Sequence, residues 1–306
     1  MTATTELGRT GIRVSRIGFG AWAIGGDAWG PVEDAESLAA IDRALELGVT
    51  FFDTADVYGR GHSEELLGRA LAGRRDEVVI ATKVGLWDSH VDRKPNIYSD
   101  AESIVRCCEA SLRRLGTDRI DVYLCHLWWD ENTEAFLEAF ARLVRDGKVR
   151  ACGVSTNDVA HLRHFDRDGT CDVVEFDYSI LNLEPERELL PYCRDRGIGT
   201  IVRGPLKMGL LSGKFDASSR WPEGDVRHKW PNEPWYREAL GTVDRLRPLA
   251  PEGMSLAELA LRFVLEQDGV DVAIPGAKTP AQVEANVRAA EGRLGPLRLD
   301  AIREAA

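Results

Sequence analysis

The sequence predicts an α/β fold, a single (β/α)₈ TIM barrel with an N-terminal β-hairpin cap, and three observations lead to this prediction. Eight apolar runs of strand length alternate along the chain with eight segments of helical periodicity. The chain has 306 residues, of which 44% are hydrophobic, and this is enough to bury a barrel core. No Pro/Ser-rich linker divides the chain, so we expect residues 1–306 to form one domain rather than a doubly wound open sheet.

The expected strands and helices follow one another in regular alternation. The strands are rich in Val, Ile or Phe and cover Arg16–Phe19, Thr50–Phe52, Val78–Thr82, Asp121–Cys125, Val149–Val154, Asp172–Phe176, Gly199–Val202 and Val270–Ile274. The helices cover Ala35–Leu47, Glu64–Leu71, Ala101–Leu115, Thr133–Arg145, Val159–Phe165, Glu186–Arg194, Leu256–Leu265 and Pro280–Ala290. The longest interruption, Ser212–Pro234, carries Trp221, Trp230 and several prolines. We expect a closing surface loop there rather than a domain boundary.

Charge and composition exclude several classes of partner. The formal net charge is −11 and the pI is about 5.2, whereas nucleic acid or an anionic membrane would require a clustered basic face. The N-terminus lacks the apolar core of a signal peptide, and no segment approaches the roughly 20 apolar residues of a membrane span. We therefore expect a soluble cytoplasmic protein. Its six cysteines show no metal-ligand spacing, so we expect reduced, packed thiols and no metal.

Polar and ionisable residues stand where the predicted strands end, which in a TIM barrel is the rim that carries the active site. These rim residues are Asp53, Lys83, His126, Ser155, Glu175, Arg203 and Pro275–Gly276. The turn in "TADVYG" brings Tyr58 back over the same mouth. We therefore expect the carboxylate of Asp53 and the phenol of Tyr58 to face one cavity.

A phenol, an ammonium, a carboxylate and an imidazole at one mouth suit proton transfer to a carbonyl oxygen. The ordinary pKa of a tyrosine is about 10. An ammonium about 4 Å away, at an effective dielectric near 20, favours the phenolate by roughly 4 kcal/mol, or about three pKa units. We therefore expect Lys83, held charged by Asp53, to lower the pKa of Tyr58, while His126 orients the substrate oxygen or shares the proton. No side chain donates hydride, so a nicotinamide cofactor is implied.

Several motifs, in order along nearly the whole chain, resemble the aldo-keto reductase family. They are "LGRTGIRVSRIGFGAW", "ELGVTFFDTADVYGRGHSEELLGRAL", "RRDEVVIATKVG", "RIDVYLCHLWWD", "GKVRACGVST", "GPLKMGLLSGK" and "IPGAKTPAQVEANV". The resemblance implies a (β/α)₈ barrel whose mouth binds NADPH, with NADH as the less frequent alternative. The family's catalytic tetrad maps onto Asp53, Tyr58, Lys83 and His126, and Tyr58 is then the general acid and base.

The resemblance also implies a set of cofactor-binding residues. They are Gly20, Ala21, Trp22, Asp53, Ser155, Thr156, Glu175, Arg203, Gly204, Pro205, Leu206, Lys214, Gly276, Lys278, Thr279, Gln282 and Asn286. Some of these depart from the family pattern. Thr156 and Glu175 stand where many members have Asn and Gln after Ser155, and Asn157 offers an amide one position away. Arg203 replaces an aromatic ring that stacks on the nicotinamide, and a planar guanidinium can also lie on a ring.

The adenosine end of the expected cofactor site follows a short loop near the C-terminus. There Lys278, Thr279, Gln282 and Asn286 open a helix whose N-terminal N–H groups favour a 2′-phosphate. Gln282 occupies a position that is frequently basic in the family, which weakens NADP specificity. Lys278 and Lys214 supply positive charge, so we expect NADPH ahead of NADH.

The substrate is expected to contact Trp22, Tyr58, Trp87, His126 and Trp128. The three tryptophans fall in loops after strand ends, where they either line an apolar pocket or complete the packing of the barrel. Trp129 is expected to be structural. The specific substrate and the reaction direction do not follow from these residues.

Each of these positions also has a purely structural interpretation. Asp53 and Tyr58 taken alone are a turn residue and a packed aromatic, and Glu175 is a solvated loop carboxylate with Arg203 as its ion-pair partner. The stretch "GFGAWA" fits a loose dinucleotide-binding fingerprint, but "IGGDAWG" follows it rather than a helix, so a Rossmann interpretation fails.

The resulting prediction is an oxidoreductase that reduces an aldehyde or ketone by hydride transfer from NADPH, with Tyr58 as the proton donor. One alternative is an NAD(P)-dependent dehydrogenase that oxidises a sugar or secondary alcohol with the same tetrad. A second is a non-catalytic, redox-sensing binding subunit. We expect a monomer that acts on a small carbonyl compound, with an oligomer as the alternative.

Overall fold

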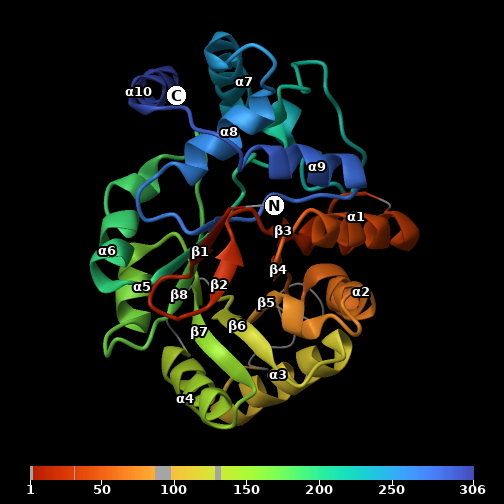
Figure 1. Cartoon of the computed structure of the whole chain (residues 1–306), viewed down its shortest axis with the longest axis vertical. Coiled ribbons are helices and arrows are strands. Elements are labelled where there is room, and N and C mark those ends of the chain that lie inside the picture. The colour runs from red at the N-terminus through yellow and green to blue at the C-terminus, as the bar shows by residue number, and fades with distance from the viewer. Residues whose placement is uncertain (1–2, 31, 87–97, 128–131) are drawn as a thin grey trace.

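The computed structural model describes residues 3–30, 32–86, 98–127 and 132–306, and it confirms the predicted barrel. Eight parallel strands form one sheet in chain order (Figure 1). They are β3 (Phe19–Gly20), β4 (Phe51–Asp53), β5 (Val79–Val84), β6 (Ile120–Cys125), β7 (Val149–Ser155), β8 (Val173–Asp177), β9 (Gly199–Arg203) and β10 (Val272–Ala273). Parallel bridges from Ile17 to Ala273 and from Gly20 to Gly276 join the first strand to the last and close the ring.

Helices surround the sheet as an outer ring (Figure 1). They are α1 (Asp34–Glu46), α2 (His62–Ala70), α3 (Ala101–Leu115), α4 (Thr133–Arg145), α5 (Val159–Phe165), α6 (Leu189–Arg196), α7 (Pro234–Leu246), α8 (Leu256–Leu265), α9 (Pro280–Arg288) and α10 (Pro296–Ala305). The sequence predictions missed α7 and α10. Gly241 and Thr242 weaken the helical signal in the middle of α7, and Ile302 is the one fully buried side chain described for α10.

The predicted N-terminal hairpin is also confirmed. Strands β1 (Thr4–Glu6) and β2 (Arg13–Ser15) pair antiparallel and lie across one end of the barrel (Figure 1). Leu7, Ile12 and Val14 from this hairpin are buried in one cluster with the inward-facing strand residues, such as Phe51 and Val122. The hairpin therefore closes the end of the barrel at which the strands begin.

A second and larger core lies between the strands and the helices. Outward-facing strand residues such as Phe52 and Tyr123 belong to it, and the ring of Tyr123 packs against Phe140 of α4. All six cysteines are free thiols, and five of them are buried, as expected. No helix in the described ranges has the length and apolar character needed to cross a membrane.

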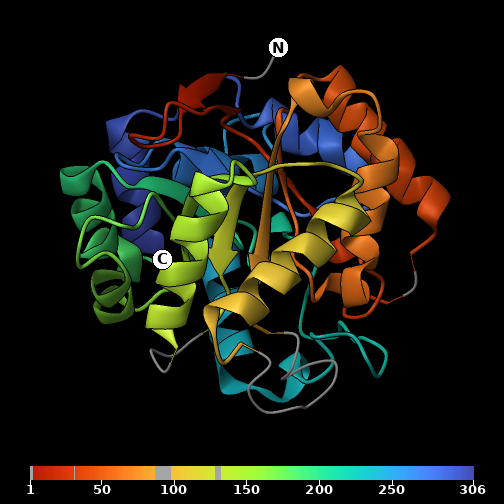
Figure 2. The ribbon, with the colours of Figure 1, turned by 90° about the horizontal axis from the view of Figure 1, so that it is seen from below.

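The segment between β9 and α7 lies at the end of the barrel opposite the hairpin (Figure 2). It contains two short 3₁₀ turns, Leu210–Ser212 and Trp230–Asn232. Trp221 stacks edge-on against Trp230, with ring centroids 5.5 Å apart, and Trp230 is buried. The segment is thus a packed loop at the mouth, as the sequence predicts.

Candidate active site

The alternation of side chains along each strand brings the rim residues into the barrel. Phe51, Val79, Val122, Ala151, Val173 and Ile201 all point inward and form the interior core. Successive strand residues face opposite sides, so a residue two or four positions further along points inward as well. The next inward positions toward the carboxyl ends are Asp53, Lys83, His126, Ser155, Glu175 and Arg203. Counting every second residue along each strand, from the inward-facing apolar residues toward the carboxyl end, therefore gives the polar residues at the mouth of the barrel.

Lys83 lies at the centre of this polar layer. Its ammonium donates hydrogen bonds to both carboxylate oxygens of Asp53, at 2.7 and 2.8 Å, and to the backbone oxygen of Thr54 at 2.9 Å. The hydroxyl of Tyr58 lies 3.4 Å from the same nitrogen, and the Oε2 atom of Glu175 lies 3.2 Å from it. Lys83, Asp53 and Glu175 are all buried. The structure thus brings together Asp53, Tyr58 and Lys83 as predicted, and adds Glu175.

Tyr58 reaches Lys83 from a 3₁₀ turn, Tyr58–Gly61, that follows β4. Gly59 has φ 59°, and a Cβ built on it would lie 2.0 Å from the carbonyl oxygen of Gly25, so the chain needs glycine here. The phenol ring stacks on Trp22 with centroids 5.9 Å apart, and the imidazole of His126 meets it edge-on at 6.4 Å. The turn therefore holds the phenol between an indole and an imidazole, with its hydroxyl at the ammonium.

The electrostatics of this set differ from the sequence-based expectation in one respect. We expected Lys83 to lower the pKa of Tyr58, but that pKa is raised, because burial disfavours the phenolate and the charges of Asp53 and Glu175 oppose that of Lys83. Burial alone would lower the pKa of Lys83, yet the two carboxylates more than offset burial and raise it. Burial, followed by the charge of Glu175, raises the pKa of Asp53. At neutral pH the tyrosine is thus a protonated phenol beside a charged ammonium.

Glu175 is an inward-facing residue in the middle of β8, so its interpretation as a solvated loop carboxylate is wrong. Ser155 donates a hydrogen bond from its hydroxyl to Oε1 of Glu175 at 3.3 Å. The Nε atom of Arg203 lies 4.0 Å from the same oxygen, and Arg203 also donates to Oδ1 of Asn157 at 2.9 Å. The carboxylate of Glu175 therefore connects the residues expected at the nicotinamide to Lys83.

The side chain of Thr156 is directed to the start of α5 rather than to the polar residues at the mouth. Its position follows an inward-facing residue, and its hydroxyl accepts a hydrogen bond from the backbone N–H of Asp158 at 3.0 Å. The same hydroxyl contacts Nδ1 of His161 at 3.3 Å. The side chain of Thr156 is thus engaged at the start of α5.

Basic side chains gather at the other end of the expected cofactor groove, beside the N-terminus of α9. Thr279 caps this helix, and its hydroxyl accepts a hydrogen bond from the backbone N–H of Gln282 at 3.3 Å. The side chain of Gln282 accepts one from the backbone N–H of Lys278 at 2.7 Å. The ammonium of Lys278 donates to the backbone oxygen of Trp29 at 2.7 Å. Asn286 is buried on the inner side of α9.

Arg227 is the functional candidate that the sequence analysis missed. Its guanidinium lies over the ring of Trp29, 4.8 Å from the centroid, and pairs through two nitrogens with Asp225, at 2.8 and 2.6 Å. Burial, followed by the charge of Arg227, lowers the pKa of Lys278, and Lys214 is a further nearby cation. The residue types in the loop gave no signal, because only the folded loop brings Arg227 near Lys214 and Lys278.

The remaining cofactor positions were expected to contribute mainly backbone. Gly20 pairs with Gly276, and Ala21 and Trp22 begin a 3₁₀ turn directly after β3. Gly204 follows β9 with φ 64°, and Pro205 and Leu206 continue the chain along the mouth. Trp87, Trp128 and Trp129 lie outside the described residues.

Ring contacts connect the two ends of the expected cofactor site. Tyr58 stacks on Trp22, whose ring meets Trp29 edge-on at 5.0 Å, and the backbone oxygen of Trp29 holds Lys278. A dinucleotide that lies along these rings would have a proton-transfer set at one end and a group of cations at the other. This donor set fits a nicotinamide dinucleotide.

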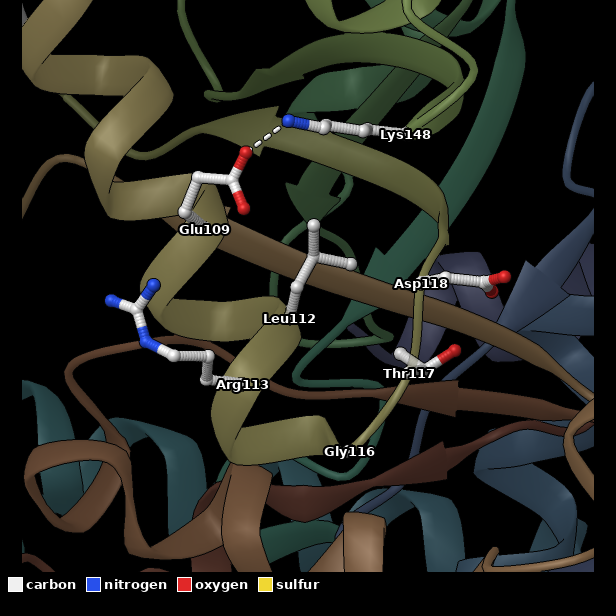
Figure 3. Close-up of a pocket in the computed structure, with 7 residues that line it drawn as sticks. All are labelled: Glu109, Leu112, Arg113, Gly116, Thr117, Asp118 and Lys148. Carbon is white, nitrogen blue, oxygen red and sulfur yellow. Dashed lines mark hydrogen bonds and ion pairs between the residues drawn. The ribbon is translucent and has the colours of Figure 1, made fainter.

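A hollow opens on the outside of the barrel between α3 and the segment before β7 (Figure 3). It is lined by Glu109, Leu112, Arg113, Gly116, Thr117, Asp118 and Lys148. Glu109 of α3 and Lys148 form an ion pair across it (Figure 3). Lys148 directly precedes β7, so the hollow lies toward the end of the barrel at which the strands begin. None of the residues predicted for the site lines it.

Comparison with known proteins agrees with this geometry. The profile of the aldo/keto reductase family matches residues 16–306. The chain belongs to this family. It is 38% identical to aldo-keto reductase YhdN of Bacillus subtilis over 290 residues, which cover 92% of this chain and 86% of that protein. It is 34% identical to the NADH-specific methylglyoxal reductase of Escherichia coli, over 98% of this chain and 97% of that protein.

Solved structures of family members superpose along almost the whole chain. The glycerol dehydrogenase of Gluconobacter oxydans matches with a TM-score of 0.83 and 30% identity, over 99% of this chain and 94% of that one. An aldo/keto reductase of Klebsiella pneumoniae in complex with NADP and acetate matches with a TM-score of 0.77 and 28% identity, over 99% and 95%. The chain is thus an NAD(P)H-dependent aldo-keto reductase, and its relatives use either NADP(H) or NADH.

Proposed function

We propose that this aldo-keto reductase converts an aldehyde or ketone into an alcohol, with Tyr58 as the proton donor. One observation carries the proposal: the hydroxyl of Tyr58 lies 3.4 Å from the ammonium of Lys83, and that ammonium is fixed by Asp53 at 2.7 and 2.8 Å. A bound nicotinamide cofactor supplies the hydride. As the hydride reaches the carbonyl carbon, the phenol gives its proton to the carbonyl oxygen.

The neighbouring side chains would position the carbonyl group. His126 meets the ring of Tyr58 edge-on, and we assign to it the second contact to the substrate oxygen. Trp22 stacks on the other side and supplies an apolar wall. All these groups come from one chain, so the proposed catalytic unit is the monomer. The substrate is a small carbonyl compound of a kind that the apolar wall would accept.

For the cofactor we propose NADPH, with NADH as the alternative. Ser155, Glu175 and Arg203 would hold the nicotinamide end. At the adenosine end, Lys214, Arg227 and Lys278 gather positive charge beside the capped N-terminus of α9, which suits a 2′-phosphate. The Klebsiella relative binds NADP, which supports this choice, while the Escherichia coli relative is NADH-specific.

The second candidate is the reverse reaction, oxidation of a sugar or secondary alcohol with NAD(P)⁺. The likeness to a glycerol dehydrogenase supports it. The same residues would serve, but Tyr58 would have to act as a phenolate base. The raised pKa of Tyr58, caused first by its burial, favours the reductive direction at neutral pH. A non-catalytic, redox-sensing subunit would show no turnover at all.

The deciding experiment is the substitution Tyr58→Phe. Oxidation of NADPH would be followed with methylglyoxal and with 4-nitrobenzaldehyde, and cofactor binding by quenching of tryptophan fluorescence. We expect Y58F to lose about 10²- to 10⁴-fold in kcat/KM while it still binds NADPH. Tyr192→Phe is the matched control, because this phenol lies on α6 and donates to Asp166. Full activity in Y58F, or no turnover by the wild-type protein with any carbonyl or alcohol, would refute the proposal.

A further inference from the structure

The ammonium of Lys83 has more acceptors around it than it has protons. Both oxygens of Asp53, the backbone oxygen of Thr54, the hydroxyl of Tyr58 and Oε2 of Glu175 lie 2.7 to 3.4 Å from its nitrogen. An ammonium carries three protons. Two buried carboxylates thus face one buried cation, and the three charges sum to −1 when both carboxylates are ionised.

The neighbouring residues that the structure describes do not neutralise the net negative charge of Asp53, Glu175 and Lys83. Ser155, on β7, gives Glu175 a neutral hydroxyl hydrogen bond. Arg203, on β9, is a second cation near the site in the described part of the chain, but its side chain is 41% exposed and its Nε atom lies 4.0 Å from Glu175. His126, after β6, meets the face of Tyr58 with its ring, at 6.4 Å between centroids. Among the residues that the structure describes, Lys83 on β5 is therefore the cation nearest the phenol, and the two carboxylates oppose its effect.

We propose that Glu175 is a positioning residue that acts through Lys83, where its carboxylate offsets the ammonium charge and opposes ionisation of the Tyr58 hydroxyl. The inference rests on the proposed function of Tyr58 and deepens it. It gives Glu175 a role besides any contact with the cofactor.

The chemistry of the step requires this state of the phenol. During reduction the O–H bond of Tyr58 breaks and a new O–H bond forms on the former carbonyl oxygen, while the cofactor is oxidised by loss of hydride. The resulting phenolate takes a proton from water before the next turnover. The ammonium of Lys83 favours the phenolate, and the carboxylates of Asp53 and Glu175 both oppose this effect. The direction of the Tyr58 pKa agrees, since burial raises it and the charge of Glu175 adds to the rise.

The substitution Glu175→Gln tests this inference by changing the charge and little else. E175Q replaces the carboxylate that faces Lys83 with a neutral amide of nearly the same size. Glu175→Asp keeps the carboxylate. Asp177→Asn removes a carboxylate from the same strand, where it pairs with Lys207 at 2.9 Å. These two variants are the controls.

The measurement is the ionisation of Tyr58 itself, without substrate. The protein would be labelled with ¹³C at Cζ of tyrosine, the Tyr58 resonance assigned by its loss in Y58F, and its shift followed by NMR against pH. We expect the Tyr58 midpoint to fall by about one pH unit or more in E175Q. The midpoints of E175D and D177N should stay within about 0.3 pH unit of wild type, well inside the shift that a neighbouring charge produces.

The inference is overturned if the E175Q midpoint equals or exceeds that of wild type, or if Tyr58 in E175Q stays protonated across the whole pH range in which the variant is folded. If E175Q does not fold, Glu175→Ser, which leaves room for water, is titrated with the same expectations. Because the titration involves no turnover, it separates this inference from the proposed function. An active Y58F would refute the function and leave the titration result standing.

Discussion

Both carboxylate oxygens of Asp53 accept hydrogen bonds from the ammonium of Lys83, at 2.7 and 2.8 Å, where both side chains are buried. An ion pair of this kind has a mixed effect on stability, because its desolvation opposes its attraction. Its clearest consequence is that neither partner can be removed alone. The proposed catalytic mouth and the stability of the barrel therefore depend on the same contact.

Removing the cation should expose this dependence. Lys83→Met leaves the carboxylates of Asp53 and Glu175 buried without their counter-ion, so we expect the free energy of unfolding to fall by about 3 to 5 kcal/mol. The double variant K83M/D53N should recover part of the loss. Lys148→Met, which breaks the half-exposed ion pair with Glu109, should cost about 0 to 1 kcal/mol. Urea unfolding followed by circular dichroism measures all three, and equal losses for K83M and K148M would contradict this account.

The barrel and most of the mouth could be predicted because both depend on short-range pattern. The alternation of apolar residues identified the strands, and the same period places Asp53 and Lys83 inside the barrel. The sign of the Tyr58 pKa shift could not be predicted, because a single ammonium–phenol pair omits burial and the charge of Glu175. The approach of Glu175 to Lys83 depends on how β8 sits relative to β5 around the closed ring, which no local pattern encodes.

At the adenosine end of the expected cofactor site, too, local sequence pattern predicted only some of the residues. Lys278 and Thr279 were found because they open a helix with a recognisable cap. Arg227 was missed because its place over Trp29 depends on a long loop folding back across the barrel, where the N–H of Val226 donates to the backbone oxygen of Ala28. Helix α7 was lost for a related reason, since it begins directly after that loop.

The turn that carries Tyr58 makes a second prediction. In Gly59→Ala the new methyl group would lie 2.0 Å from the carbonyl oxygen of Gly25. The alanine would also have to adopt φ 59°, in the left-handed region that disfavours residues with a Cβ atom. We expect a stability loss clearly greater than the roughly 1 kcal/mol of left-handed strain alone, and about 10- to 100-fold lower kcat/KM because the phenol moves. Gly11→Ala is the control, since Gly11 has φ 69° and nothing lies within 4 Å of its Cβ position. If both variants behaved alike in unfolding and kinetics, the close approach to Gly25 would be unimportant.

Asp56 predicts a pH dependence of stability that is separate from catalysis. Its carboxyl is buried, and no described residue gives its Oδ1 atom a hydrogen bond. Burial, followed by the charge of Glu64, raises its pKa to about 8. A folded-state pKa above the unfolded value of about 4 means that the folded protein holds the extra proton, so stability falls as pH rises from about 4 to 8. Asp56→Asn should remove this fall.

We therefore expect D56N to gain stability relative to wild type between pH 5 and pH 9, by on the order of 2 kcal/mol. Unfolding curves in guanidinium chloride at a series of pH values measure this difference. Asp118→Asn changes a carboxylate that is 93% exposed, and its difference from wild type should stay flat over the same range. A flat difference for D56N as well would show that Asp56 ionises normally in the folded protein.

The cations at the adenosine end make the last prediction, on cofactor choice. Lys278 and Arg227 would each meet the 2′-phosphate of NADPH, which NADH lacks, so either charge should matter for one cofactor only. We expect Lys278→Met and Arg227→Met each to weaken NADPH binding about tenfold, with little change for NADH. Lys229→Met, in the same loop and exposed, is the control and should bind both cofactors as wild type does. Quenching of tryptophan fluorescence suits the titration because Trp22 and Trp29 lie in contact between Tyr58 and Lys278. Equal losses for NADPH and NADH would place these cations at the shared pyrophosphate instead and would leave the NADPH preference unsupported.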